Sequence, residues 1–139
     1  MSELVRFSVA MPAELLTQFD SLVARRGLAK NRSEVIRDLV RESLVSEEWD
    51  DPDAEIVGTL SIVYSHHARD LQGKLDHIQH THHGMIVSSM HVHLDAHNCL
   101  EVIVLRGQSH LIRRLAESIL GVKGVKHGNL SATTTGTNL

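Results

Sequence analysis

The sequence has one cysteine in 139 residues, few aromatic residues and no long apolar run. A single cysteine excludes a disulfide within the chain, which suits a reducing compartment. No apolar stretch approaches the roughly 20 residues that a membrane-spanning helix needs, and the first residues lack the basic start and apolar run of a secretory signal. We therefore expect a cytoplasmic protein with no membrane partner.

The net charge of −3 does not by itself indicate a nucleic-acid partner, although a total cannot exclude a local basic face. The charge is unevenly distributed: residues 1–45 carry seven basic and six acidic side chains, residues 46–55 carry six acidic and no basic ones, and residues 56–139 carry seven basic and five acidic ones. The acidic, proline-containing segment indicates a linker between two domains. The alternative is a solvated loop inside one domain.

The first part of the chain predicts one strand and two helices. Residues 5–11 alternate apolar and polar side chains, as in a half-buried strand. Pro12 can start a helix, and Gly27 can end it after two arginines. Asn31 and Glu34 are spaced as in a capping box, which predicts the start of a second helix.

A single strand has no partner within so small a unit, and its core is too small to be stable alone. We therefore expect a dimer in which two copies of the strand pair antiparallel and present Arg6, Ser8 and Ala10 on their outer face. A two-stranded ribbon of this kind fits the major groove of DNA. The segments 6–9 (Arg-Phe-Ser-Val), 25–27 (Arg-Arg-Gly) and 31–38 (Asn-Arg-Ser-Glu-Val-Ile-Arg-Asp) together resemble a ribbon-helix-helix DNA-binding domain. The alternative is a module that only dimerises.

The second part of the chain predicts the order strand, helix, strand, strand, helix, strand. The expected elements are residues 56–64, 67–83, 85–94, 100–105, 111–120 and 125–132. This order is the ferredoxin-like βαββαβ arrangement. The sequence thus predicts an α+β protein with a ribbon-helix-helix domain at residues 1–46, an acidic linker at 47–55, a ferredoxin-like sensor domain at 56–134 and a loose tail at 135–139.

The single cysteine lies close to two histidines in the expected hairpin. His91 and His93 are two residues apart on one strand, so their side chains share a face, and a turn brings Cys99 back opposite His93. Two imidazoles and a thiolate suit nickel, copper or zinc better than magnesium or calcium. The alternative is a buried structural cysteine beside surface histidines. Residues 79–83 contain further histidines, one of which could be a fourth ligand.

The two halves together resemble the nickel-responsive transcriptional repressor family NikR. The resemblance covers Arg6 to about Leu130, and its most specific parts are Gln79-His80, His91-Val92-His93 and Cys99-Leu100-Glu101. It implies a repressor, and not an enzyme, that binds double-stranded operator DNA when a nickel ion is bound and that controls nickel uptake. It also implies a homotetramer with an ACT-type sensor core.

The resemblance further implies which residues act. His91, His93 and Cys99 of one subunit would bind nickel together with His80 of a neighbour in a square plane. Arg6, Ser8 and Ala10 would face the bases, although a hydroxyl residue is common in the family at the third of these positions. Glu34 and Asp38 match positions of a second cation site between the domains.

Several residues and functions stay open on the sequence alone. Gln79 and Glu101 flank the expected ligands and are candidates for orienting them. The remaining histidines read as solvated or hydrogen-bonded, with His66 as a further ligand for another metal geometry. Rival functions are a metal storage or transport protein, and a ribbon-helix-helix antitoxin-type regulator whose second half binds a protein.

Overall fold

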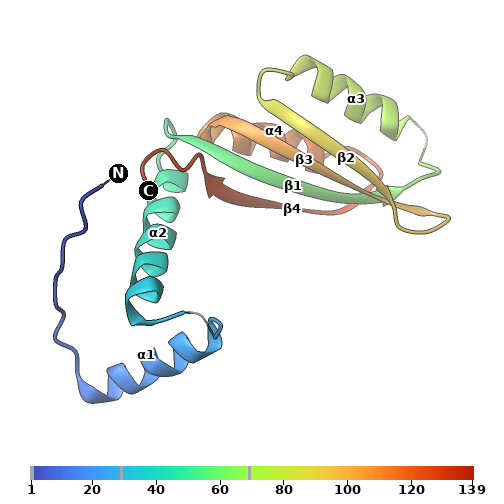
Figure 1. The fold of residues 1–139 in the computed structure, drawn as a ribbon. Helices are drawn as coiled ribbons and strands as arrows, with labels where there is room; N and C mark the ends of the chain where they lie inside the picture. The colour runs from blue at the N-terminus through green and yellow to red at the C-terminus, as the bar shows by residue number, and fades with distance from the viewer. Residues whose placement is uncertain (1, 29, 69) are drawn as a thin grey trace. The chain divides into compact units, whose positions relative to one another are not determined.

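A computed structural model describes residues 2–28, 30–68 and 70–139 (Figure 1). The chain forms two compact units, Met1–Glu42 and Ser43–Leu139. Helix α2 has residues in both of them, and each unit is described separately below. Within the described ranges, the structure contains no helix with the length and apolar character needed to cross a membrane.

The first unit contains α1 (Ala13–Arg25) and the first part of α2 (Arg32–Asp50). Pro12 is the N-cap of α1, and Gly27 adopts a φ of +119°, a conformation that favours glycine, just after the helix ends. The side chain of Asn31 accepts a hydrogen bond from the backbone N–H of Glu34 at 2.9 Å. The predicted start and end signals of these helices are therefore confirmed.

The strand expected at residues 5–11 is not formed in the single chain. Residues 2–10 are exposed and have no regular secondary structure, and the side chain of Phe7 is 73 % exposed. A strand needs a second strand to satisfy its backbone hydrogen-bonding groups, and this unit offers none. Among its described residues, Val35 is the only fully buried hydrophobic side chain, so the unit lacks a core of its own.

The acidic segment also differs from expectation, because its first part is helical. Residues 46–50 form the last turns of α2, and Trp49 packs against the core of the second unit. The backbone carbonyl of Trp49 accepts hydrogen bonds from Ser109 Oγ at 2.7 Å and from Arg113 at 3.0 Å. The Arg113 guanidinium also lies 4.6 Å from the centre of the Trp49 ring. These contacts explain why this stretch is held as a helix rather than as an open linker.

The second unit has the predicted βαββαβ order. Its elements are β1 (Glu55–Ser65), α3 (Leu71–Thr81), β2 (Ile86–His93), β3 (Asn98–Gln108), α4 (Ser109–Leu120) and β4 (Val125–Thr134). The strands form one sheet in the order β2-β3-β1-β4, and all neighbours are antiparallel.

The core of this unit lies between one face of the sheet and the two helices (Figure 1). Burial alternates along β1 and β3, so every second side chain points to the helices. Leu71 and Leu75 of α3, and Ile112 and Ile119 of α4, complete the core. The other sheet face carries half-exposed side chains, which include Val57, Val63, Leu100, Val102 and Val104.

Helix α3 is shorter at its start than the predicted range of residues 67–83, in which residue 69 lies outside the described residues. The backbone N–H of His66 donates to the carbonyl oxygen of His97 at 2.7 Å, which ties this segment to the β2–β3 turn. Asp70 then adopts a left-handed conformation with φ of 59° before the helix begins at Leu71. This long-range hydrogen bond explains why the helix starts late.

Candidate metal centre

The β2–β3 hairpin places the expected ligands as the sequence predicted. In the register of the two strands, His93 is paired with Cys99 and His91 with Glu101. The rings of His91 and His93 share a face of β2, with their centroids 4.8 Å apart. The Cys99 thiol is fully buried, whereas both histidines are exposed. The hairpin therefore places all three predicted ligands on two neighbouring strands, but the described ligand atoms that lie within 4.8 Å of one another belong to His66, His93 and Cys99, without His91.

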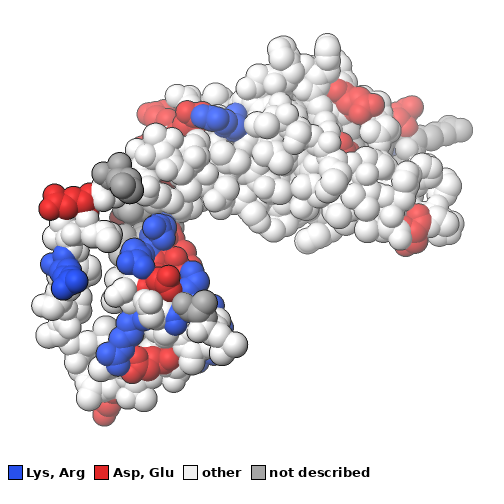
Figure 2. All heavy atoms as spheres, viewed as in Figure 1, with Lys and Arg blue, Asp and Glu red and all other residues white. Residues whose placement is uncertain are grey.

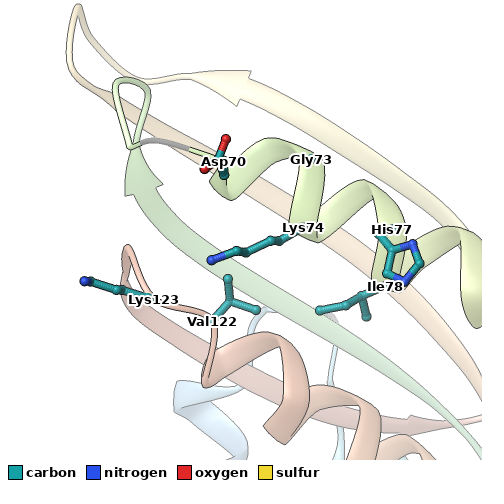
Figure 3. A pocket seen from close by; sticks show the side chains of 7 residues that line it. All are labelled: Asp70, Gly73, Lys74, His77, Ile78, Val122 and Lys123. Carbon is teal, nitrogen blue, oxygen red and sulfur yellow. The ribbon is translucent and has the colours of Figure 1, made fainter.

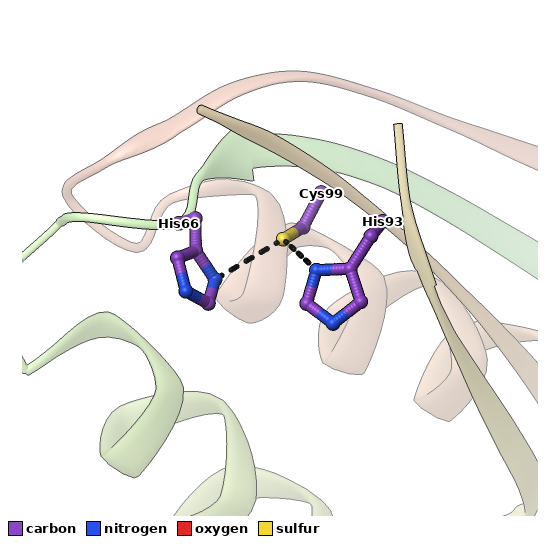
Figure 4. Close-up of side chains that lie close together, drawn as sticks. All are labelled: His66, His93 and Cys99. Carbon is purple, nitrogen blue, oxygen red and sulfur yellow. Dashed lines mark hydrogen bonds between the residues drawn. The ribbon is translucent and has the colours of Figure 1, made fainter. Parts of the chain in front are cut away.

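The structure places His66, which the sequence offered only as a further ligand for another metal geometry, directly beside Cys99. The Sγ atom of Cys99 lies 3.6 Å from Nδ1 of His93 and also 3.6 Å from Nδ1 of His66. Figure 4 shows the two rings on either side of the sulfur. His66 follows the end of β1, where Tyr64 is paired with Cys99. The sequence named His66 as a possible ligand but did not give its position beside Cys99, because the register of β1 and β3 joins residues far apart in the chain.

These distances suit a bound transition metal. A metal about 2.3 Å from sulfur and about 2.05 Å from nitrogen holds the two atoms about 3.5 Å apart at a tetrahedral angle and about 3.1 Å apart at a right angle. The observed 3.6 Å is therefore within about 0.1 Å of the tetrahedral distance and about 0.5 Å longer than the right-angle distance of a square-planar ion. Imidazole and thiolate donors fit nickel, copper and zinc.

A hydrogen-bond chain fixes which nitrogen of His91 can bind a metal. Gln72 donates through its amide nitrogen to Asp76 at 3.0 Å, so its amide oxygen is the acceptor for the Tyr64 hydroxyl at 2.8 Å. The hydroxyl has one proton, which this bond uses. The contact of 2.9 Å between the Tyr64 oxygen and His91 Nδ1 then requires that Nδ1–H donates. This network assigns the tautomer of His91 in which Nε2 is free for a metal.

Glu101, which is paired with His91 across the two strands, also joins this network. Its carboxylate is almost fully buried, accepts a hydrogen bond from Gln79 Nε2 at 2.8 Å and lies 3.4 Å from the Tyr64 hydroxyl. Burial, together with the negative charges of Glu101 and Cys99, raises the pKa of Tyr64. Tyr64 therefore stays protonated and keeps its role as donor and acceptor. This arrangement agrees with the prediction that Gln79 and Glu101 lie near the ligands.

The β2–β3 turn that carries His97 is fixed by Asp95. Its carboxylate accepts hydrogen bonds from the backbone N–H groups of His97 and Asn98 at 2.7 and 2.8 Å, and from the Asn98 side chain. The Asn98 side chain and these backbone donors lower the pKa of Asp95 to about 2. Because the Asp95 carboxylate accepts the hydrogen bonds that hold the turn, the groups of this hairpin that are left to bind a metal are the imidazoles.

A cavity of about 390 Å³ opens beside the candidate ligands. It is lined by Tyr64, Ser65, His66, Ala68, Leu71, Gln72 and His91. Two imidazoles and a phenol hydroxyl therefore border a space that is large enough for a further side chain. This cavity is the part of the site into which a ligand from outside the chain could reach.

A larger cavity of about 530 Å³ lies apart from these ligands, beside α3 and the turn before β4. Figure 3 shows Lys74 and His77 on α3, and Lys123 on the turn, around it. The two ammonium groups outnumber the single imidazole and the single carboxylate, that of Asp70, and so disfavour a cation in this larger cavity.

The other predicted site residues lie elsewhere in the chain. His80 is exposed on α3, and its ring is 6.4 Å from that of His83, so the single chain does not bring it into the Cys99 cluster. Arg6, Ser8 and Ala10 are exposed in the segment before α1. Asp38 forms ion pairs that hold its pKa below the usual value, chiefly through its hydrogen bond from a lysine.

Comparison with known proteins decides the family. Residues 57–133 match the model of the NikR C terminal nickel binding domain, and residues 5–47 match that of the ribbon-helix-helix protein, copG family. A protein of Geobacter sp. (strain M21) that is named as a nickel-responsive regulator is 54 % identical over all of this chain and 99 % of its own length. A protein of the same name from Geotalea uraniireducens (strain Rf4) is 52 % identical over the same shares. The chain belongs to the NikR family.

The two family-model matches divide the candidate residues of this NikR chain between them. The ribbon-helix-helix match contains Arg6, Ser8 and Ala10, and the nickel-binding match contains the cluster of His66, His93 and Cys99. A relative named as a nickel-responsive regulator in Nitratidesulfovibrio vulgaris (strain DSM 19637 / Miyazaki F) is 53 % identical over the whole chain and 99 % of its own length. The predicted family and its two-part architecture are thereby confirmed.

Proposed function

We propose that this chain is a nickel-dependent transcriptional repressor that binds operator DNA when nickel occupies the Cys99 site. The observation that carries the proposal is a buried thiol flanked by exposed imidazoles in a chain of the NikR family. The donors fit a borderline-soft divalent ion. Bound nickel would supply a fixed set of directed bonds that joins parts of the assembly, and no catalytic step is required.

The proposed nickel ligands are His91, His93 and Cys99 of one chain with His80 of a second copy. His91 Nε2 is free because Nδ1 donates to Tyr64, and the cavity of about 390 Å³ borders His91. His80 is exposed on α3 and is therefore available to a neighbour. Three imidazoles and one thiolate can bind nickel in a square plane. His66 is the rival fourth ligand, and it favours tetrahedral ions such as zinc.

The proposed assembly is a homotetramer in which ribbon-helix-helix dimers flank a core of sensor domains. Two apolar surfaces support self-association. The first is formed by the exposed apolar side chains within residues 4–9, among which Phe7 is 73 % exposed. The second is the sheet face opposite the helices. A unit with one fully buried hydrophobic residue cannot repay its conformational entropy alone. Pairing of two N-terminal strands would satisfy their backbone groups and form the ribbon.

Operator DNA would contact the ribbon through Arg6, Ser8 and Ala10. Figure 2 shows lysine and arginine side chains over α1 and α2, interleaved with carboxylates, whereas the visible face of the sheet is mostly uncharged. An arginine can read guanine, a serine can bond several bases, and an alanine can touch a thymine methyl group. Positive charge on the same unit would add phosphate contacts that carry no sequence information.

Nickel and DNA would be coupled through the arrangement of the subunits. A His80 ligand from a second copy would order α3 and fix how neighbouring sensor domains meet, which favours one spacing of the DNA-binding dimers. Such coupling is typically about 1–3 kcal/mol and is reciprocal, so DNA should also tighten nickel binding. The regulated genes would then include those for nickel uptake.

We also propose that Glu34 and Asp38 contribute to a second cation site. The two carboxylates are four residues apart on α2 and so share a helix face. Asp38 is already paired with Lys30 at 2.9 Å and with Arg41 at 3.5 Å. A cation would have to displace these basic groups, so this site should be weaker than the Cys99 site.

The proposed function is tested by measuring binding of the demetallated protein to labelled DNA from upstream of its own gene. We expect tight binding only after nickel is added and loss of binding when a chelator removes it. Metal binding with no effect on DNA would instead support storage or transport. Full binding in the presence of chelator would favour an antitoxin-type regulator. Either result would refute the nickel-gated repressor.

A further inference from the structure

The larger cavity, between α3 and the turn before β4, lies apart from the candidate metal centre. Its volume is about 530 Å³, which is within the range of about 300–1,000 Å³ that is typical of small-molecule sites. Four of its lining residues belong to α3, and Val122 and Lys123 of the turn face them across the space. Figure 3 shows Lys74 reaching from the helix toward that turn. The cavity therefore has the size of a ligand site and walls from two separate segments.

The wall of this cavity that adjoins the protein core is apolar. Ile78 of α3 and Val122 of the turn line the cavity, and both pack against the core while remaining partly exposed. The turn is held by hydrogen bonds from Val122 N–H to the Ile119 carbonyl oxygen at 3.2 Å and from Val125 N–H to the Val122 carbonyl oxygen at 3.1 Å. A ligand that covers Ile78 and Val122 would remove their exposed surface from water, which favours binding. The wall thus suits an occupant with an apolar body.

The charged groups around the cavity favour an anion. Lys74 and Lys123 contribute two ammonium groups, against the single carboxylate of Asp70. Within the described part of the chain, neither of these lysines forms an ion pair. The imidazole of His77 adds a hydrogen-bond donor. A carboxylate in this cavity would therefore meet two positive charges that no described acidic side chain neutralises.

Gly73 supplies an independent indication that the cavity is kept open. Glycine inside an exposed helix is unfavourable relative to alanine, so it usually has a packing or functional reason. Gly73 does not have a positive φ, and a Cβ atom built on it would meet nothing within 4 Å. Neither backbone conformation nor close packing requires glycine here. Because Gly73 lines the cavity, the remaining physical reason is the space that a side chain would fill.

We propose that this cavity is a binding site for a small organic carboxylate with a compact apolar body. Lys74 and Lys123 bind the carboxylate, and the apolar body covers Ile78 and Val122 in the space beside Gly73. A bare phosphate would use the ammonium groups but would leave the apolar wall exposed to water. The site does not involve nickel, so the inference stands or falls separately from the proposed function.

The first test uses benzoate as the probe and separates the roles of charge and apolar body. Its affinity for the demetallated full-length protein is measured by ligand-observed NMR, which detects weak binding. Benzoate should bind saturably and about tenfold more tightly than benzamide, which has the same ring without the charge. Acetate and inorganic phosphate, which have charge without the ring, should each bind at least about tenfold more weakly than benzoate. Absence of saturable benzoate binding, or equal affinity for benzoate and either benzamide or phosphate, would overturn the proposal.

The second test locates the site by filling it. Gly73→Leu places a large side chain in the cavity and should weaken benzoate binding at least about tenfold. The matched control Gly73→Ala leaves most of the space and should bind benzoate within about twofold of wild type. Leucine and alanine both favour helix more than glycine does, so a loss of binding in Gly73→Leu alone cannot come from an unfolded α3. Equal benzoate affinity in the two variants would overturn the assignment of this cavity.

The third test removes the positive charges. The double variant Lys74→Met, Lys123→Met keeps long side chains and should weaken benzoate about tenfold, to the affinity of benzamide. Its control is Arg37→Met, Arg114→Met, which removes the same charge from two exposed residues outside the cavity lining and should bind benzoate normally. Equal losses in the two double variants would show attraction to net charge only and would overturn the proposed site.

Discussion

Replacing Tyr64 by phenylalanine tests whether the hydroxyl group prepares His91 for nickel. The hydroxyl is the acceptor for His91 Nδ1–H at 2.9 Å and donates to Gln72 at 2.8 Å. Without it, Nδ1–H has no partner in this network, and His91 can adopt the tautomer that places its proton on Nε2. Groups that orient metal-binding histidines typically contribute about 10- to 100-fold to metal affinity, which is about 1.4–2.7 kcal/mol. We therefore expect Tyr64→Phe to weaken nickel binding by this factor.

The same substitution should also lower the stability of the protein without metal. Tyr64 is 2 % exposed, so the Gln72 oxygen loses a buried partner, and a lost hydrogen bond of this kind costs about 1–2 kcal/mol. Nickel affinity is measured by competition with a chelator, and stability by urea unfolding of the demetallated protein. The two measurements separate a local effect on His91 from general unfolding.

The matched control is Gln72→Leu, which removes the hydroxyl's other partner. The Tyr64 proton can then turn to Glu101, whose carboxylate is 3.4 Å away, while the oxygen still accepts from His91. Nickel affinity should stay within about threefold of wild type, because the His91 tautomer is preserved. The reasoning would be refuted if Tyr64→Phe bound nickel as tightly as wild type, or if Gln72→Leu were weakened to the same extent.

Three further predictions follow from the site and the ribbon. Mixing His80→Ala chains with Cys99→Ala chains should restore some tight nickel sites that neither protein has alone, and no recovery would contradict a site shared between subunits. Arg6→Ala should weaken operator binding by about 1–3 kcal/mol and relax base preference while nickel affinity in the absence of DNA is unchanged; an equal loss on unrelated DNA would identify Arg6 as a phosphate contact only. Asp95 has a folded-state pKa of about 2, below its ordinary value of 3.8, so its contribution to stability is present above about pH 4 and is lost as the pH falls toward 2. Unfolding curves of wild type and Asp95→Asn should therefore differ most near neutral pH and converge near pH 2, and a constant difference would exclude this role.

The register of the hairpin could be predicted from the sequence because its geometry is local. His91, His93 and Cys99 lie within nine residues, and strand alternation with one turn determines which of them face each other. The family resemblance added His80, which the single chain leaves outside the cluster. The capping signals at Asn31 and Gly27 were reliable for the same reason: each acts over a few residues.

The remaining features depend on contacts that sequence patterns do not encode. The position of His66 beside Cys99 follows from the pairing of β1 with β3, which joins residues more than 30 positions apart. The late start of α3 follows from the hydrogen bond between His66 and His97. The helical end of α2 follows from the packing of Trp49. The N-terminal strand needs a second chain, so its local alternation is not sufficient to form it.

The most direct test of the nickel-gated account is one titration with two readouts. Nickel is added to demetallated full-length protein in the presence of labelled operator DNA, and the Cys99 thiolate band and DNA anisotropy are recorded together. The account predicts that both signals rise in parallel, reach a plateau at the same nickel-to-chain ratio and are absent in Cys99→Ala. Nickel-dependent DNA binding of normal affinity in Cys99→Ala, or full DNA binding by the wild type before any nickel is added, would contradict it.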